Sequence, residues 1–266
     1  MRRKKLLLII SCLLIPISLL IGFGIYYLNY WNLIPSSYYT ATELNLPIVK
    51  SRSDFNNNGI DDYTDILNGA RKDIANAPVY DGSYQPGGYP PENVGVCTDV
   101  VWRAFREAGY SLKDMIDADI AEHLSDYPRI KKKADPNIDF RRVPNLRVFF
   151  QKYALSLTLD PTQVEEWQPG DIVTYGDHHI AIVSDRRTKK GVPYIIHNGG
   201  QPVFEEDALT REEISGHFRF DASKIEEKVL KDSEERRVKS EEPFKGSEEP
   251  FKGSEERRVK SEERKR

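Results

Sequence analysis

Residues 94–105 read Val94-Gly-Val-Cys97-Thr-Asp-Val-Val-Trp-Arg-Ala-Phe105 and place a cysteine directly before an amphipathic segment. Apolar residues follow it at helical spacing, namely Val100, Val101, Ala104, Phe105 and Ala108. A thiol at a helix N-terminus feels the positive end of the helix dipole, which lowers its pKa toward neutrality. The stretch therefore predicts a reactive Cys97; the alternative is a small, buried and inert cysteine.

Two later histidines lie in strand-like runs. His179 opens the run His-Ile-Ala-Ile-Val, and His197 ends the run Tyr-Ile-Ile-His. A cysteine at a helix start and histidines on strands are the groups that nucleophilic thiol catalysis needs. Side chains alternate along a strand, so His179 shares a face with Ala181 and Val183. We expect the small Ala181 to let the cysteine's helix approach, and we prefer His179 to His178, which points the other way.

The N-terminus predicts a membrane anchor. Residues 1–5 are basic, and residues 6–28 carry no charge, which matches the roughly 20 residues needed to span a bilayer. Aromatic residues that suit the membrane interface follow, namely Tyr26, Tyr27, Tyr30 and Trp31. Without a small-residue cleavage site, an uncleaved single-pass signal anchor is preferred to a cleaved signal peptide. The basic end is then cytoplasmic, and the chain after a linker at 29–53 lies outside the membrane.

Residues 54–65 follow the pattern of a calcium loop, with Gly59 at the sixth position. The expected ligands are Asp54, Asn56, Asn58, the carbonyl of Ile60, Asp62 and Asp65. All are hard oxygen donors, so Ca²⁺ is favoured, in a structural role. The loop resembles those of dockerin-like and thrombospondin-type repeats. The alternative is an Asn/Asp/Gly-rich turn that caps the following helix without a metal.

Residues 233–266 form a degenerate seven-residue repeat that begins with Ser-Glu-Glu units. Each unit holds one apolar residue, and Pro243 and Pro250 would break a helix, so a coiled coil is excluded. We predict a disordered tail of nearly balanced charge. Its basic residues alternate with acids, which argues against nucleic-acid binding.

Several segments together carry a family resemblance. Cys97, residues 167–173 (Trp-Gln-Pro-Gly-Asp-Ile-Val) and the strand that begins at His179 resemble the NlpC/p60-type cysteine peptidases, papain-like hydrolases of bacterial cell-wall peptides. Residues 95–101, 142–146, 169–173 and 195–198 more closely resemble an exported bacterial family called domain of unknown function 1287. The resemblance runs from about residue 66 to about 220.

The resemblance implies an α+β, papain-like domain at 66–222, in which the helix of the nucleophile packs on an antiparallel sheet. It implies Cys97 as nucleophile, His179 as base and His197 as the residue that orients the base, with Asn198 as the alternative orienter. The expected function is cleavage of amide bonds in peptidoglycan stem peptides through a thioester, on the outside of the bacterial cytoplasmic membrane. A wall-peptide-binding module and an acyltransferase are the alternatives, and the oligomeric state stays open.

Each charged residue near Cys97 has two possible roles, one in binding substrate and one in the structure or in solvent. Val96 stands where NlpC-type enzymes often carry Asp, and Asp99 follows two residues after the cysteine. Asp99 is expected either to hold a substrate amine or to support the first helical turn. Arg141, Arg142 and Arg147 are expected either to meet stem-peptide carboxylates or to stay solvated.

Overall fold

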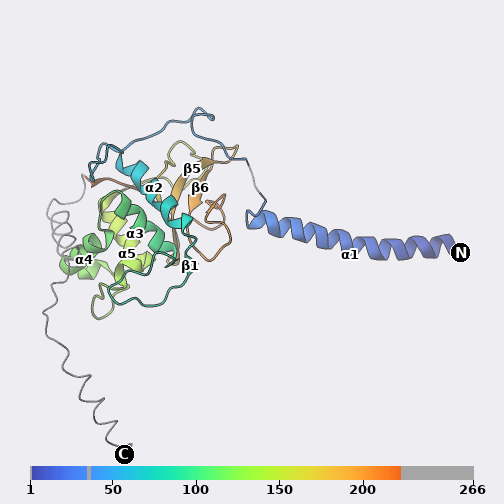
Figure 1. Ribbon diagram of the computed structural model, residues 1–266, viewed down its shortest axis with the longest axis horizontal. Helices are drawn as coiled ribbons and strands as arrows, with labels where there is room; N and C mark the ends of the chain where they lie inside the picture. The colour runs from blue at the N-terminus through green and yellow to red at the C-terminus, as the bar shows by residue number, and fades with distance from the viewer. Residues whose placement is uncertain (1, 35–36, 223–266) are drawn as a thin grey trace, which may run out of the picture.

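The computed structural model describes residues 2–34 and 37–222, which form a mixed α+β domain and one long N-terminal helix (Figure 1). Helix α1 (Arg2–Tyr30) projects from the domain as a stalk. Its part from Cys12 to Tyr30 is long and apolar enough to cross a membrane, and none of its residues is buried. By length and composition, α1 is therefore suited to be a membrane anchor or a signal sequence. The tail at 233–266 lies outside the described residues.

The centre of the domain is a six-stranded antiparallel sheet in the order β3-β8-β4-β5-β6-β7. The strands are β3 (Ala154–Ser156), β4 (Ile172–Tyr175), β5 (His179–Arg187), β6 (Pro193–Ile196), β7 (Glu205–Glu206) and β8 (Gly216–Phe220). The predicted antiparallel sheet is confirmed, and β3 adds a strand before the expected start of the sheet at about residue 171. The turn at 176–178 brings Tyr175 of β4 opposite His179 of β5.

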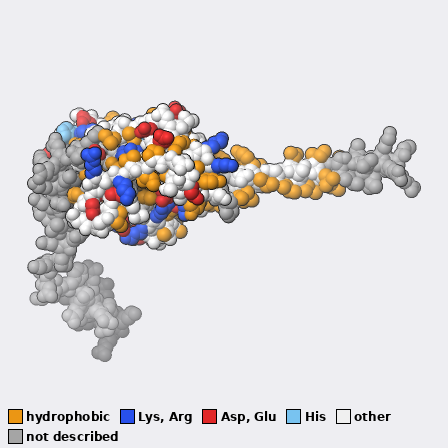
Figure 2. Space-filling model, turned by 90° about the horizontal axis from the view of Figure 1, so that it is seen from above, with side chains coloured by type: hydrophobic (Ala, Val, Ile, Leu, Met, Phe, Trp, Pro, Cys, Tyr) orange, Lys and Arg blue, Asp and Glu red, His pale blue; other side chains and the backbone are white. Residues whose placement is uncertain are grey.

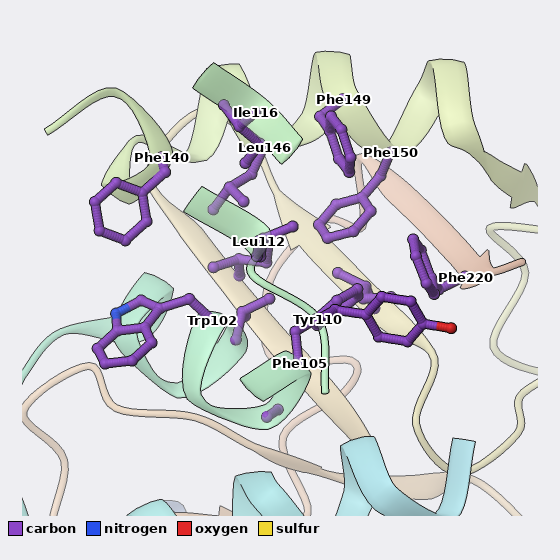
Figure 3. Packing of buried hydrophobic residues seen from close by; sticks show 14 of the residues in the cluster. Trp102, Phe105, Tyr110, Leu112, Ile116, Phe140, Leu146, Phe149, Phe150 and Phe220 are labelled. Carbon is purple, nitrogen blue, oxygen red and sulfur yellow. The ribbon is translucent and has the colours of Figure 1, made fainter. Parts of the chain in front are cut away.

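The helices gather on one face of this sheet (Figure 1). They are α2 (Asp62–Ala75), α3 (Cys97–Glu107), α4 (Leu112–Glu122) and α5 (Val143–Tyr153), with short 3-10 turns η1 (Leu124–Asp126) and η2 (Asp139–Arg141). Figure 3 shows the aromatic packing between them, in which Phe105 lies 4.8 Å from Phe220 and 5.6 Å from Phe150, between ring centroids. Each such buried side chain contributes about 1.5–3 kcal/mol.

Helices α2 and α3 approach closely because α2 carries a glycine at the contact. A Cβ atom on Gly69 would lie 2.6 Å from the Cβ of Glu107 and 2.8 Å from the Cα of Ala104. Such distances are shorter than real contacts allow, so the helix spacing depends on the missing side chain. This packing holds the calcium-type loop, which precedes α2, against the helix that carries Cys97.

The two faces of β5 bury different clusters. Ile180 and Ile182 pack into the helix-side core, which also contains Cys97. Ala181 and Val183 belong to a second cluster on the opposite face. The expectation that Ala181 lets the cysteine's helix approach is therefore wrong, because α3 packs on the alternate residues. The strand itself and its period of two are as predicted.

Candidate functional site

Cys97 is the first residue of α3 and lies against the backbone where β5 begins. Its side chain is buried, with 5% of the residue exposed. Its Sγ donates a hydrogen bond to the carbonyl oxygen of His178 at 4.0 Å. Burial raises the pKa of the thiol to about 11, although the Ile180 backbone N–H acts in the opposite direction. The predicted lowering of this pKa is therefore wrong, because desolvation outweighs the helix dipole.

Three side chains form a hydrogen-bonded relay that begins at His179, the residue after the one whose carbonyl accepts from Cys97. His179 Nε2 lies 2.7 Å from His197 Nδ1, and His197 Nε2 lies 3.0 Å from Glu206 Oε1. An ionised carboxylate only accepts, so His197 Nε2 carries a proton, and in the neutral tautomer of His197 the Nδ1 atom accepts from His179 Nε2. The relay consequently leaves the lone pair of His179 on Nδ1. His197, which sequence analysis assigned to orient the base, does contact it.

The charges of the relay follow from its surroundings. Burial opposes ionisation of Glu206, but hydrogen bonds from His197, Arg211 and Asn32 outweigh it and hold its pKa at about 2. Burial first, and then the neighbouring histidines, lower the pKa of His179 to about 3. At neutral pH the site therefore contains a neutral thiol, a neutral His179 and an ionised Glu206.

Two hollows meet at this site. One, of about 380 Å³, is lined by His179 and His197, and the other, of about 580 Å³, is lined by Cys97. Tyr80 and His178 line both. Within the described part of the chain, no hydrogen bond joins the Cys97 thiol to the His179 ring.

His178 is the histidine that sequence analysis set aside. Its Nε2 lies 2.7 Å from Glu212 Oε2, and its side chain is largely exposed. Its backbone carbonyl accepts from the Cys97 thiol, and its side chain faces both hollows. His178 therefore meets the sulfur through its backbone and shares the Cys97 hollow, while its ring pairs with Glu212.

Asp99 stabilises the start of α3. Its carboxylate accepts from the backbone N–H of Val96 at 2.7 Å and from the indole of Trp102 at 2.8 Å. Arg141 donates two further bonds to it, both of 2.8 Å, and both side chains are buried. Of the two expected roles, Asp99 therefore has the structural one, and Arg141 is its partner.

Asn198, the alternative orienter, makes other contacts. Its amide donates to the carbonyls of Pro78 at 3.1 Å and Gly95 at 3.2 Å, and its oxygen accepts from the backbone of Gly200. These bonds join it to the parallel pair β1 (Val79–Tyr80) and β2 (Val94–Gly95), which directly precedes Cys97. Asn198 therefore fixes the entry to α3.

The remaining predicted arginines differ in position. Arg142 lines the hollow of Cys97 together with Arg129. Arg147 donates to the carbonyl of Gly176 at 2.9 Å and pairs with Asp177 at 2.6 Å. Arg142 and Arg129 thus give the Cys97 hollow a positive rim, whereas Arg147 holds the β4–β5 turn.

The calcium-type loop folds around Asp65. The side-chain amides of Asn56 and Asn58 donate to Asp65 Oδ2 at 2.9 and 3.0 Å. Asp54 accepts from the backbone N–H groups of Asn58 and Gly59. The amide nitrogens of Asn56 and Asn58 thus meet Asp65, while their oxygens accept from the backbone N–H groups of Asn58 and Ile60. No group of three or more His, Cys, Asp or Glu side chains suited to a metal occurs in the described residues.

Asp62 and Ile60, two of the expected calcium ligands, form hydrogen bonds of their own within the domain. Asp62 accepts from Tyr110 at 2.6 Å and from the backbone of Phe55 at 2.9 Å, which commits both its oxygens. Asp54 likewise accepts with both its oxygens, so these bonds do not set Asp62 apart from the other expected ligands. Ile60, whose carbonyl was expected to contribute, donates its N–H to Asn58 Oδ1 at 2.8 Å.

Sequence reasoning missed Glu206, Arg211 and Asn32. Arg211 donates to both oxygens of Glu206, at 2.7 and 2.8 Å, and Asn32 donates to Oε2 at 2.7 Å. These residues come from the two-residue strand β7, a loop and the end of α1. No periodicity or motif links them, so the sequence offered no signal for their convergence.

Comparison with known proteins shows that the chain matches one family. The family described as Domain of unknown function (DUF1287) matches residues 67–220. The chain is also 38% identical over 165 residues to the "Uncharacterized protein YijF" of Escherichia coli (strain K12), an alignment that covers 58% of this chain and 80% of the relative. No solved structure matches the chain.

Proposed function

From the premise that the chain belongs to the DUF1287 family, we propose that it is a membrane-anchored cysteine hydrolase of amide bonds with a papain-like arrangement of helix and sheet. The observation that supports this proposal is that the Cys97 thiol bonds the backbone carbonyl of His178, the residue before His179, while His179 itself belongs to a relay with His197 and Glu206. The substrate class is the stem peptide of peptidoglycan, which fits an exported domain. The hydrolysis takes place on the extracytoplasmic side of the bacterial membrane.

The proposed reaction begins with proton transfer from the Cys97 thiol to Nδ1 of His179. The sulfur attacks the amide carbonyl carbon, and the backbone N–H of Cys97 stabilises the oxyanion. The C–N bond breaks, the leaving amine takes the proton from His179, and a thioester remains. His179 then takes a proton from water, whose oxygen attacks the thioester and releases the acid and the thiol.

The relay supports the charged form of His179 during this step. A proton on Nδ1 makes the ring cationic, and the negative charge of Glu206, linked to the ring through His197 by two short hydrogen bonds, favours this form against burial and the neighbouring histidines. The thiol must leave the carbonyl of His178 to reach the imidazole. The hollow on each side of Tyr80 and His178 provides space for the substrate and for this rotation.

Two further assignments belong to the same proposal. The basic residues before the apolar stretch support an orientation in which the N-terminus of α1 is cytoplasmic and the domain lies outside. The loop at 54–65 binds Ca²⁺ through Asp54, Asn56, Asn58 and Asp65, whose side chains already converge. The ion would replace the amide–carboxylate bonds around Asp65 and stiffen the entry to α2.

The test uses the purified full chain in detergent with peptidoglycan as substrate. The parent protein should release new amines, and Cys97→Ala and His179→Ala should each reduce the release by at least 100-fold. His178→Ala is the matched control and should keep most of the activity. Release by Cys97→Ala at the parental rate would refute the thiol mechanism, and loss of activity in His178→Ala alone would assign the base to that residue.

A wall-peptide-binding module is the second candidate. The buried thiol with a raised pKa and its hydrogen bond to a carbonyl favour this alternative, since neither helps a nucleophile. Such a module would bind stem peptides in the two hollows with equal affinity in the parent and in Cys97→Ala. Binding by calorimetry without amine release would support it.

A further inference from the structure

The end of α1 is built into the candidate site. Asn32 has φ +50°, a left-handed conformation, and the backbone bonds Leu33 N to Leu28 O (2.9 Å) and Asn32 N to Asn29 O (3.1 Å) close the helix. This is the Schellman arrangement, and asparagine tolerates its left-handed position. The chain therefore turns sharply at the end of the apolar helix and enters the domain there.

Side chains of the domain hold this turn. Asn32 Nδ2 donates to Glu206 Oε2 at 2.7 Å, on the carboxylate that binds His197. Arg211, which also binds Glu206, donates to the carbonyl of Tyr30 at 2.9 Å. Its guanidinium lies 5.2 Å from the Tyr30 ring and 5.9 Å from the Trp31 ring. The helix end is thus fixed to the relay by several contacts at one point.

Tyr30 and Trp31 also form part of the wall of the 380 Å³ hollow that contains His179. Tyrosine and tryptophan at the end of an apolar span lie at the level of the lipid headgroups. Figure 2 shows the hydrophobic side chains of the stalk continuing up to the surface of the domain. With α1 in a bilayer, a hollow with such a wall lies next to the membrane surface.

We infer that the site takes an amide substrate held in the same membrane, a lipid-linked peptide, in preference to a free peptide or one in a distant polymer. This inference rests on the proposed hydrolysis for its chemistry and on the contacts of α1 for its location. The lipid would stay in the bilayer beside α1, and the peptide would reach His179 along the wall formed by Tyr30 and Trp31. Restriction to one surface raises the effective concentration of such a substrate.

The first test measures the position of the hollow and is independent of activity. Single fluorophores are placed on the full chain through Glu212→Cys, which lines the hollow, and Ser125→Cys, which follows α4, in a Cys12→Ser, Cys97→Ser background. Helix α4 lies on the side of the domain away from α1 (Figure 1). In vesicles that carry a headgroup spin label, the Glu212 probe should be quenched at least threefold more than the Ser125 probe. Equal quenching would overturn the inference.

The second test measures the substrate class. The full chain is reconstituted in vesicles with a lipid-linked peptidoglycan precursor, or supplied with a soluble muramyl peptide that has the same stem peptide. At equal bulk concentration the lipid-linked form should be cleaved at least tenfold faster. Equal rates would overturn the inference and leave the proposed hydrolysis intact, and cleavage of neither form would refute both.

Asn32→Gly provides a variant of the clamp that keeps the left-handed turn, because glycine tolerates positive φ. It removes the amide donor to Glu206. Preference for the lipid-linked substrate should fall at least threefold, with a higher KM for that substrate and an unchanged KM for the soluble peptide. Asn29→Ala, an exposed amide one turn earlier on α1, is the matched control and should leave both values unchanged. Equal effects of the two substitutions would contradict the role of the clamp.

Discussion

Replacement of Asp99 by asparagine tests how the cysteine's helix is held. The Asp99 carboxylate accepts four hydrogen bonds of 2.7–2.8 Å, two of them from Arg141, and neither side chain is exposed to solvent by more than 1%. Asparagine keeps one acceptor oxygen and turns an N–H₂ group toward donors. The substitution leaves a buried guanidinium without its counter-ion, and the expected loss is about 3–5 kcal/mol.

The loss corresponds to a fall in Tm of about 6–20 °C for a domain of this size. Thermal unfolding of the full chain in detergent, followed by circular dichroism, measures it. Asp177→Asn is the matched control, because Asp177 forms an exposed pair with Arg147 and should cost at most about 1 kcal/mol. Equal losses in the two variants would refute the structural role of Asp99.

The same substitution has a second readout. The charge of Asp99 raises the pKa of Cys97, in addition to the larger effect of burial. Asp99→Asn should therefore lower the pKa of the thiol, which the pH dependence of iodoacetamide labelling reports. A pKa that stays unchanged or rises would show that the carboxylate does not act on the sulfur.

Other predictions concern pH, the metal and packing. The pKa of His179 is about 3 in the folded protein and near 6.5 in the unfolded one, so the unfolded state binds the extra proton between these values. The urea midpoint of unfolding should therefore decline as pH falls from about 6.5 toward 3. A midpoint that rises in this range would contradict the burial of the ring. At 100 times its Kd, Ca²⁺ should stabilise the parent by about 2.7 kcal/mol and Asp54→Asn by less, as thermal unfolding measures. Equal shifts in the two proteins would exclude the loop at 54–65 as the calcium site. Gly69→Ala should lower the free energy of unfolding by about 1–3 kcal/mol, because the new Cβ would collide with Glu107. Gly82→Ala is the control: its new Cβ would have its nearest contact at 3.5 Å and should leave the stability nearly unchanged in the same urea titration.

The elements with strong periodicity could be predicted from the sequence. The helix after Cys97 follows from the spacing of Val100, Val101, Ala104 and Phe105, all buried in the structure. Strand β5 follows from its run of apolar residues after His179, and its hairpin with β4 from the short turn at 176–178. These are local features, which depend on residues close together in the chain.

The predictions that were wrong concern features that depend on contacts between segments far apart in the chain. The choice of face on β5 depends on which side α3 covers, and alternation alone does not specify that side. The pKa of Cys97 depends on burial, which the packing of several helices determines. Glu206 and Asn32 are 174 residues apart in the chain and meet at 2.7 Å, so no sequence pattern could have paired them.

The central claim is that Cys97 becomes acylated with His179 as its base. The direct measurement is intact and peptide mass spectrometry of the full chain mixed briefly with wall peptides and quenched in acid. We expect an adduct on Cys97 that has the mass of the acyl fragment. Hydroxylamine should remove this adduct, and His179→Ala should not form it. Amine release without any adduct on Cys97, or an adduct of equal yield in His179→Ala, would contradict the central claim.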